Sequence, residues 1–283
     1  MTSGSLPVAA FEQPPLVLTF AASDPTSGAG LQADLLTIAS LGCHGTSVLT
    51  GITVQDSAGV DEVMALDVDW VDDQARTLLE DMSVSAFKLG VLCSAENVRV
   101  IAEIMSDYPD IPLVFDPVLA SGRGDSLSDE EVIEAMRELL LPQATIVTPN
   151  SLEARRLAAT DQDEELESLT LDVCAQRLLQ IGAEYVLITG THEVSSSVTN
   201  RLFNAAGLVR ADEWQRLPGS YHGSGCTLAS AIAAMLALGA DLPDAVQQAQ
   251  EYTWNTLAHA FRPGMGQAIP DRFFWSRQMA PND

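Results

Sequence analysis

Positive charge is what this 283-residue sequence has least of. Lys88 is the only lysine, and 14 basic residues stand against 39 acidic ones, so the formal net charge is −25. A field of that sign repels nucleic acid and anionic membranes, and we expect neither as a partner. It also repels nucleotides. Any phosphate site must therefore be local, built from backbone N–H groups, a metal ion and a few placed cations.

Long apolar runs and an N-terminal cluster of positive charge are also missing. No hydrophobic run approaches the ~18 residues of a membrane span. No basic residue precedes Arg76, whereas a secretory signal peptide needs a positive N-terminal region. We therefore predict a cytoplasmic protein. The cysteines Cys43, Cys93, Cys174 and Cys226 form no C-x-x-C pair, and at least three of them are interpreted as small buried residues in a reducing compartment.

Short apolar segments alternate with segments of helical periodicity along most of the chain. Continuous apolar runs such as PLVF and YVLI are typical of strands in a parallel sheet that is covered on both faces. Strands are expected at 16–20, 47–54, 86–89, 113–115, 145–148 and 185–189. Helices are expected at 31–41, 68–82, 95–108, 129–141, 151–158, 171–181, 227–238 and 244–261.

The edge and the ends of this arrangement can also be predicted. Two strand-like runs around AAG, between Val198 and Trp214, indicate an antiparallel hairpin at the sheet edge. Residues 1–15 are small, polar and rich in proline, and we expect them to be disordered. No internal repeat or linker divides the remainder, so residues 16–283 are predicted to form a single α/β domain.

The segment HGSGCTLASAIAA, residues 222–234, places small residues before an alanine-rich helix. The first N–H groups of a helix lack partners, and its dipole adds roughly half a positive charge there. Gly223, Ser224 and Gly225 are therefore a candidate anion hole for a phosphate. An ordinary turn before a packed helix explains an isolated G-x-G at least as often. Cys226 and Thr227 would add a thiol and a hydroxyl at the same place.

Two further candidate segments each follow a predicted strand. Residues 21–34 (AASDPTSGAGLQAD) contain neither G-x-G-x-x-G nor the lysine of a P-loop, so neither nucleotide motif applies. The turn still lies at the carboxyl end of a strand, where open α/β sheets bind ligands. In TPNSLE, Asn150 and Glu153 share one face of an opening helical turn and could hold a hydrated Mg²⁺. Alone, Asn150 is more often an N-cap.

Six stretches occur along the chain in this order: SDPTSGAGLQADL, SVLTGITVQDSAGV, FKLGVL, FDPVLASGRGD, LLPQATIVTPNSLEA and HGSGCTLASAIAA. They resemble the signature stretches of the hydroxymethylpyrimidine/phosphomethylpyrimidine kinases of thiamin biosynthesis, and the resemblance extends over about residues 16–275. Related sugar kinases carry aspartate at the position of Cys226, whereas cysteine marks this family and some vitamin B6 kinases. The resemblance implies a ribokinase-like three-layer α/β sandwich: a mostly parallel central sheet, helices on both faces and an edge β-hairpin.

The resemblance also implies the roles of individual residues. The pyrimidine substrate would contact Gln55, Ala22, Val54, Val91 and Asp24. ATP would contact Asn150, Thr189, Arg123 and Thr227, and a magnesium ion would lie at Glu153 and Asn150. The anion hole would consist of Gly223, Ser224 and Gly225, and Cys226 would take the position of the catalytic base. Lys88 is interpreted as structural, and relatives suggest a homodimer.

Three departures from the family pattern concern the phosphates and the opening turn. Thr189-Gly-Thr-His replaces Lys-Gly-Gly-His, so a phosphate-facing lysine is missing. The stretch after FDPVL carries Arg123 near its Gly-Asp in place of a lysine, and the opening motif has Ala22 where the family has glycine. We infer either a lower ATP affinity than is typical or a substitute positive charge at Arg123.

The predicted function is ATP-dependent phosphorylation of 4-amino-5-hydroxymethyl-2-methylpyrimidine, and then of its monophosphate to the diphosphate. Phosphoryl transfer has a loose transition state, so positioning and charge neutralisation matter more than proton removal. A thiol with a pKa of ~8.5 at Cys226 can stay neutral or ionise, whereas an aspartate would repel the monophosphate. Two alternatives remain open: a vitamin B6 kinase, and a non-catalytic relative that binds the pyrimidine or its phosphate.

Overall fold

A nine-stranded sheet forms the centre of the computed structural model, which describes residues 13–120, 124, 127–160, 163 and 165–278. Its strand order is β3-β2-β1-β4-β5-β6-β7-β8-β9. The strands are β1 (Leu16–Ser23), β2 (His44–Gln55), β3 (Val60–Ala65), β4 (Ala86–Leu89), β5 (Leu113–Phe115), β6 (Ile146–Val147), β7 (Tyr185–Ile188), β8 (Ser197–Asn204) and β9 (Gly207–Gln215). β1, β2 and β4–β7 pair in parallel.

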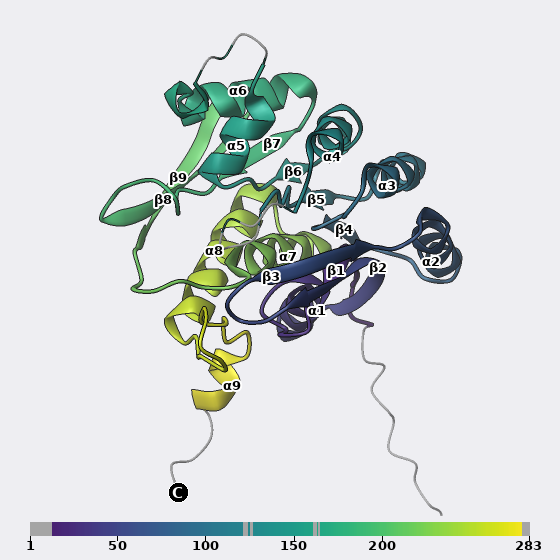
Figure 1. The fold of residues 1–283 in the computed structure, drawn as a ribbon, viewed down its shortest axis with the longest axis horizontal. Coiled ribbons are helices and arrows are strands. Elements are labelled where there is room, and N and C mark those ends of the chain that lie inside the picture. Colours follow the sequence, from purple (N-terminus) through teal and green to yellow (C-terminus); the bar gives the residue numbers. More distant parts are fainter. Residues whose placement is uncertain (1–12, 121–123, 125–126, 161–162, 164, 279–283) are drawn as a thin grey trace, which may run out of the picture.

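Helices cover both faces of the sheet (Figure 1). They are α1 (Gly30–Ser40), α2 (Val68–Asp81), α3 (Ala95–Asp107), α4 (Glu130–Ala135), α5 (Ser151–Ala158), α6 (Leu171–Ile181), α7 (Ser224–Ala237), α8 (Leu242–Ala258) and α9 (Phe274–Gln278). α2–α6 lie on one face, and α1, α7 and α8 lie on the other. Side chains of Asp67, Ser94, Asp129 and Thr170 cap α2, α3, α4 and α6, which is why these helices begin where the sequence predicts.

The predicted fold class is confirmed, and every strand and helix expected from the sequence is present. The predicted edge hairpin is β8–β9, which joins β7 in antiparallel fashion. Two elements were missed, β3 and the short C-terminal helix α9. β3 pairs antiparallel with the end of β2, but its residues VDEVMA are mostly exposed and have little of the apolar character that marks a strand. The helix predicted over 129–141 is α-helical only to Ala135 and continues as a π-helical turn.

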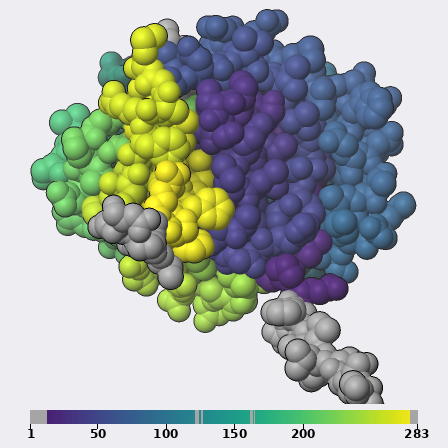
Figure 2. Space-filling view, turned by 90° about the horizontal axis from the view of Figure 1, so that it is seen from below, coloured from purple at the N-terminus to yellow at the C-terminus, as the bar shows by residue number. Residues whose placement is uncertain are grey.

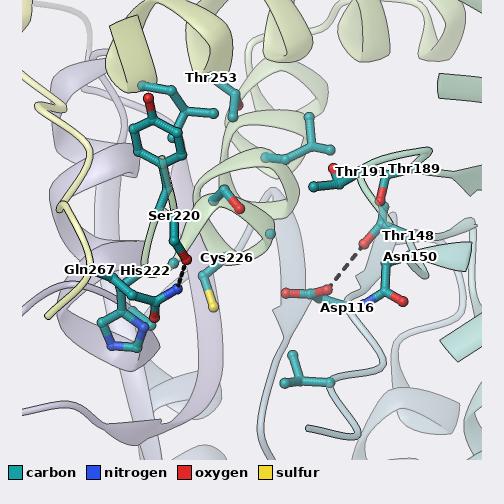
Figure 3. A pocket seen from close by; sticks show the side chains of 18 of the residues that line it. Asp116, Thr148, Asn150, Thr189, Thr191, Ser220, His222, Cys226, Thr253 and Gln267 are labelled. Atoms are coloured by element: carbon teal, nitrogen blue, oxygen red, sulfur yellow. Dashed lines mark hydrogen bonds between the residues drawn. The ribbon is translucent and has the colours of Figure 1, made fainter. Parts of the chain in front are cut away.

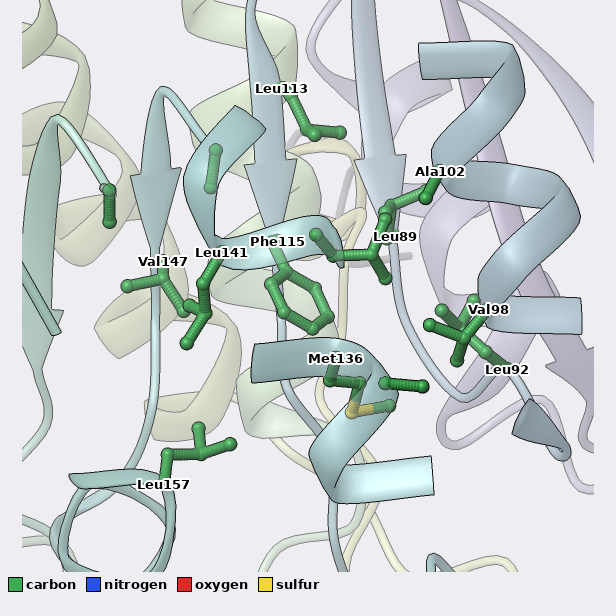
Figure 4. Packing of buried hydrophobic residues seen from close by; sticks show 14 of the residues in the cluster. Leu89, Leu92, Val98, Ala102, Leu113, Phe115, Met136, Leu141, Val147 and Leu157 are labelled. Atoms are coloured by element: carbon green, nitrogen blue, oxygen red, sulfur yellow. The ribbon is translucent and has the colours of Figure 1, made fainter. Parts of the chain in front are cut away.

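Two hydrophobic layers hold the sandwich together. The larger layer lies between the sheet and α2–α6 and includes Leu89, Phe115 and Met136, which are all fully buried (Figure 4). The second layer packs α7 against the sheet, with alanines filling most of the contact. Small side chains let α7 approach the strands closely, so the start of this helix is held firmly at the sheet edge.

Two further sequence predictions, the disordered N-terminal lead-in and the single domain, extend beyond the residues that the structure describes. Residues 1–12 of the expected N-terminal lead-in lie outside them, whereas Pro15 accepts a hydrogen bond from the backbone of His44. One domain over 16–283 stays a prediction, although strands between Leu16 and Gln215 all enter one sheet. In the described part of the chain, no helix has the length and apolar character to cross a bilayer.

Candidate functional site

A cavity of about 460 Å³ opens at the carboxyl ends of the parallel strands. Residues that follow β1, β4, β5, β6 and β7 line it, together with the first turn of α7. All parallel strands end at the same edge of a sheet, and open α/β sheets bind ligands there. The volume suits a small molecule.

The start of α7 forms one wall of the cavity. Gly223, Ser224 and Gly225 all line it, and α7 begins without a side-chain cap. α1 also begins without a side-chain cap, and its first residues Ala29 and Gly30 line the same space. Two helix starts thus direct the positive ends of their dipoles toward one cavity, although the Ala29 N–H at α1 already donates to Asp24. The structure places the predicted anion hole where an anionic group could enter.

Gly223 gives this wall its shape. Its φ of +82° lies in the left-handed region, and a Cβ atom here would collide with the carbonyl oxygen of Gly28. Glycine is the residue that adopts this conformation without a steric cost. The close approach brings the loop of residues 24–30 directly against the beginning of α7.

Cys226 lines the cavity but is only 8% exposed. Burial raises the pKa of its thiol to about 12; the charges of Asp116 and Asp34 also raise it, whereas Lys88 and a hydrogen bond from the Gly30 N–H lower it. The thiol is therefore protonated at neutral pH. The sequence suggested a thiol near its ordinary pKa of ~8.5, and burial corrects that assumption.

Asp116 is the functional candidate that the sequence analysis missed. It follows β5 in the stretch FDPVL, lines the cavity and is 4% exposed. Its Oδ1 accepts from the Thr148 hydroxyl at 3.5 Å, and its Oδ2 has no hydrogen-bond partner in the described structure. Burial raises the pKa of Asp116 to about 6, against the opposing effect of Lys88. An aspartate directly after a buried strand was the available signal.

Figure 3 shows the side chains of Cys226 and Asp116 extending toward each other from opposite sides of the cavity. A weak interaction with the thiol lowers the pKa of Asp116, although no hydrogen bond of ordinary geometry joins the two. A Cβ at Gly225 would lie 3.9 Å from both carboxylate oxygens. A carboxylate, a neutral thiol and a helix start therefore surround one small space.

An ion pair between Lys88 and Asp34 is buried in the core. Lys88 Nζ lies 2.9 Å from Asp34 Oδ2, and neither side chain is exposed. The hydroxyls of Thr19 and Ser230 donate to the same carboxylate at 2.6 and 2.8 Å. Burial alone would lower the pKa of Lys88, but the charge of Asp34, and those of Cys226 and Asp116 when they are ionised at alkaline pH, outweigh it and raise the pKa. Lys88 does not line the cavity, in agreement with its structural interpretation.

Four of the five residues expected at the pyrimidine line the cavity: Gln55, Ala22, Val91 and Asp24. Gln55 Nε2 donates to the hydroxyl of Thr53 at 2.7 Å. Val54 does not line the cavity; it is 56% exposed. Successive side chains of a strand point to opposite faces, so Thr53 and Gln55 face the cavity and Val54 cannot. The Val54 side chain is therefore not placed to contact a substrate in the cavity.

Asp24 lines the cavity, but its carboxylate is engaged within the loop of residues 24–30. It accepts hydrogen bonds from Thr26, from the Ala29 N–H and from His222 Nε2 at 2.8 Å. Burial would raise the pKa of Asp24, yet the bonds from His222, Ala29 and Thr26 together lower it. Asp24 therefore shapes the loop. The sequence analysis had not given His222 a role.

Thr227 was expected at ATP, but it is fully buried and does not line the cavity. Its hydroxyl donates to the Gly223 carbonyl and accepts from Arg272. Arg272 also donates to the carbonyls of Ser27 and Gly28, at 3.1 and 2.6 Å. Figure 2 shows the C-terminal segment lying against the N-terminal part of the chain. Arg272 thus joins the 24–30 loop to α7, and the sequence contained no signal for this long-range contact.

Asn150 and Glu153 form a capping box at the start of α5, and both line the cavity. Asn150 Oδ1 accepts from the backbone of Leu152 and Glu153. Only the amide N–H₂ of Asn150 then remains for a ligand, and it can donate to a phosphate but cannot bind a metal ion. The expected metal contact of Asn150 is therefore wrong.

Glu153 is buried, and its two oxygens accept from the backbone N–H groups of Asn150 and Leu119. Burial, followed by the charge of Asp116, raises the pKa of Glu153 to about 8. No cluster of three or more metal-ligating side chains occurs among the described residues. Mg²⁺ commonly takes one or two carboxylates, with phosphate and water completing its shell. The unpartnered Oδ2 of Asp116, with Glu153 nearby, fits that requirement.

Aromatic and apolar side chains of β9, α8 and the segment after β9 also line the cavity. Trp214 of β9 and Trp254 of α8 stack with ring centroids 6.4 Å apart, and Leu217 and Leu257 lie in the same wall. Thr189 also lines the cavity, and its expected contact with ATP stays a prediction. Arg123 lies outside the described residues. Sequence reasoning missed the tryptophan pair because the two residues are 40 positions apart.

Known proteins are similar to this chain in sequence and in fold. The family model described as phosphomethylpyrimidine kinase matches residues 24–271. The hydroxymethylpyrimidine/phosphomethylpyrimidine kinase of Streptomyces coelicolor is 41% identical, over 94% of this chain and 96% of its own length.

Two solved structures show the same fold. A phosphomethylpyrimidine kinase from Clostridium difficile is 33% identical, with a TM-score of 0.72 over 84% of this chain and 97% of the other. A Bacillus subtilis pyridoxal kinase solved as an ADP complex is 28% identical, with a TM-score of 0.83 over 94% of this chain and all of the other. Because the family model spans most of the chain, this protein belongs to the phosphomethylpyrimidine kinase family.

Proposed function

We propose that this protein uses ATP to phosphorylate 4-amino-5-hydroxymethyl-2-methylpyrimidine, and then phosphorylates the monophosphate to the diphosphate. The observation that carries the proposal is the meeting of Cys226, Asp116 and the uncapped start of α7 around one space in the cavity. Family membership supports a kinase of this specificity, because the relative from Streptomyces coelicolor carries that name over nearly its whole length.

The cavity has two parts that suit the two substrates. The part beside Gln55, Ala22 and Val91 suits a small heteroaromatic ring, since the Gln55 amide can donate and accept at the ring edge. The part between Trp214 and Leu257 suits the base of the nucleotide, because aromatic and apolar side chains bury a flat ring. The reacting groups would then meet between them, at the start of α7.

Charge neutralisation follows from the residues between these two parts. The N–H groups of Gly223–Gly225 would bind the transferring phosphoryl group, and the Asn150 amide would donate to a phosphate oxygen. Mg²⁺, which Asp116 and Glu153 would hold, supplies the positive charge that lets carboxylates and phosphates share one site. With pKa values of about 8 and about 6, Glu153 is mostly protonated and Asp116 mostly ionised at pH 7 when no cation is bound.

Cys226 would orient the attacking oxygen. Its thiol is neutral at pH 7 because its pKa is about 12, so it can donate a hydrogen bond to an anionic phosphate oxygen without repelling it. In the first step the hydroxyl keeps its proton until late, because the transition state is loose. A neutral thiol is therefore compatible with both steps. We expect Cys226→Ala to fold normally and lose most phosphorylation, and Cys226→Asp to impair the second step more than the first.

A second candidate is a vitamin B6 kinase, favoured by the close fold similarity to pyridoxal kinases. Product analysis by ³¹P NMR, after incubation with Mg-ATP and either the hydroxymethylpyrimidine or pyridoxal, separates the two. We expect pyrimidine monophosphate followed by diphosphate. Turnover of pyridoxal alone would establish the second candidate. Binding of the pyrimidine without turnover would establish the non-catalytic alternative and overturn the proposal.

A homodimer and a cytoplasmic location also stay part of the proposal. Support for a homodimer comes from apolar side chains exposed on the β2–β3 hairpin, namely Ile52, Val54 and Met64. Ile52 and Met64 are directly paired, so they form a continuous apolar surface of the kind that a second subunit covers. Sedimentation of the wild type and of Ile52→Glu tests the homodimer. We expect the wild type to be a dimer and Ile52→Glu to be a monomer, and a monomeric wild type would contradict the proposal.

A further inference from the structure

Of the lysine and arginine side chains in the described residues, Arg216 is the one that lines the large cavity. It immediately follows β9, which ends at Gln215, and it lines one wall of the cavity together with its neighbours Trp214, Gln215 and Leu217. Thr189, Thr191 and His192, from the loop between β7 and β8, lie in that wall as well. Arg216 therefore stands where a nucleotide seated against Trp214 would extend its phosphates.

The guanidinium of Arg216 is held by backbone carbonyl groups. It donates to the carbonyl oxygens of Thr191, Glu193, Ser195 and Ser197 at 2.8–3.3 Å. No carboxylate in the described part of the chain lies within ion-pair distance of it, whereas Arg155, Arg210 and Arg277 each have such a partner. Carbonyl oxygens fix the side chain but carry no net charge, so its positive charge is left uncompensated.

The surroundings make this charge unusual. The protein has a net charge of −25, and the acidic side chains Asp116 and Glu153 line the same cavity. His192 is the other candidate cation in this wall. Partial desolvation, and next the charge of Arg216, lower the pKa of His192 below its usual 6.5, so at pH 7 the imidazole is neutral. A nucleoside triphosphate, with a charge of about −4, would then meet Arg216 as the one fixed cation that the described residues place in this wall of the cavity.

We propose that Arg216 is a positioning residue for the nucleotide: it holds the 189–196 loop at the cavity wall and supplies the positive charge that attracts the phosphate chain. This inference rests on the proposed function, since it takes ATP as the ligand. Position 189 in the same wall is threonine, so no second cation contributes there.

Isothermal titration of the full-length protein with adenosine, AMP, ADP and ATP tests the inference. We expect Arg216→Gln to weaken ATP binding at least tenfold, to weaken ADP and AMP progressively less, and to change adenosine less than twofold. Arg201→Gln is the matched control. Arg201 lies on β8, pairs with Asp172 and lines a separate, smaller cavity, so we expect none of its four affinities to change.

The dependence on ligand charge distinguishes an electrostatic role from a purely structural one. Equal weakening of all four ligands would mean that Arg216 only holds the loop, and unchanged ATP binding would mean that it does neither; each result overturns the proposal. If wild-type protein bound no nucleotide, the proposed function itself would fail, which is a different outcome from a loss confined to Arg216 variants.

Two further variants keep the test decisive if Arg216→Gln does not fold. Arg216→Lys retains the charge, and we expect it to weaken ATP binding less than threefold. Thr189→Lys in the wild-type chain adds a cation to the same wall, and we expect ATP to bind at least threefold more tightly while adenosine is unaffected. In the Arg216→Gln background it should restore part of the loss. No gain for ATP from Thr189→Lys in either background would contradict the idea that this wall lacks positive charge.

Discussion

Lys88 permits a sharp test of how the core beneath the cavity is stabilised. Lys88→Met keeps an unbranched apolar side chain, one atom shorter, but leaves the carboxylate of Asp34 buried without its counter-ion. Thr19 and Ser230 still donate hydrogen bonds to that carboxylate, but they carry no charge. Removing one partner of a buried ion pair costs about 3–5 kcal/mol. In a domain of about this size, 1 kcal/mol shifts the melting temperature by about 2–4 °C, so we expect a decrease of about 6–20 °C.

The assay is urea unfolding followed by circular dichroism, combined with thermal melting. Lys88→Met with Asp34→Asn removes both charges, and we expect it to recover at least about 2 kcal/mol of the loss, since no unpaired charge remains buried. Arg76 forms exposed pairs with Asp72 and Asp107, so Arg76→Met should cost less than about 1 kcal/mol and serves as the control.

The pH dependence of this effect also has a defined sign. The pKa of Lys88 is raised above its ordinary 10.5, so the stability that it contributes is fully present below 10.5 and is lost only above that value. The destabilisation by Lys88→Met should therefore be constant from pH 6 to 9. A loss below about 1 kcal/mol, or no recovery in the double variant, would refute the reasoning.

Three further outcomes are expected. Gln55→Ala should raise the KM for the pyrimidine and leave the KM for ATP unchanged, because a buried polar edge of the substrate without its hydrogen-bond partner costs about 1–3 kcal/mol. If steady-state kinetics show an equal rise in both KM values, Gln55 does not contact the pyrimidine. Gly223→Ala should abolish most activity and lower the melting temperature. A residue with a side chain loses about 1–2 kcal/mol at a φ of +82°, and its Cβ would also collide with Gly28. Normal activity and melting would show that the start of α7 adapts. Cys226, with a pKa of about 12, should be ionised in about one molecule in 10⁴ at pH 8. Iodoacetamide should therefore label it slowly, as followed by intact-mass spectrometry, and rapid labelling at that pH would contradict a buried neutral thiol.

Local sequence determined much of this protein. The alternation of apolar strands and amphipathic helices predicted the layers, because burial on two faces or on one stripe is encoded within each segment. The small residues Gly223–Gly225 before an alanine-rich run predicted a candidate anion hole at a helix start, although α7 begins at Ser224, three residues earlier than expected. The order of six motifs indicated the family, which the matching family model then established.

Tertiary structure decided which side chains meet and in what charge state. Asp116 and Cys226 are 110 positions apart, and only the packing of α7 across the sheet brings them to one space. Burial there makes the thiol neutral, which no residue pattern records. The pleat of β2 turned Val54 outward, and Arg272 took the hydroxyl of Thr227. Pairing, burial and pKa depend on residues distant in sequence, so they are properties of the folded chain alone.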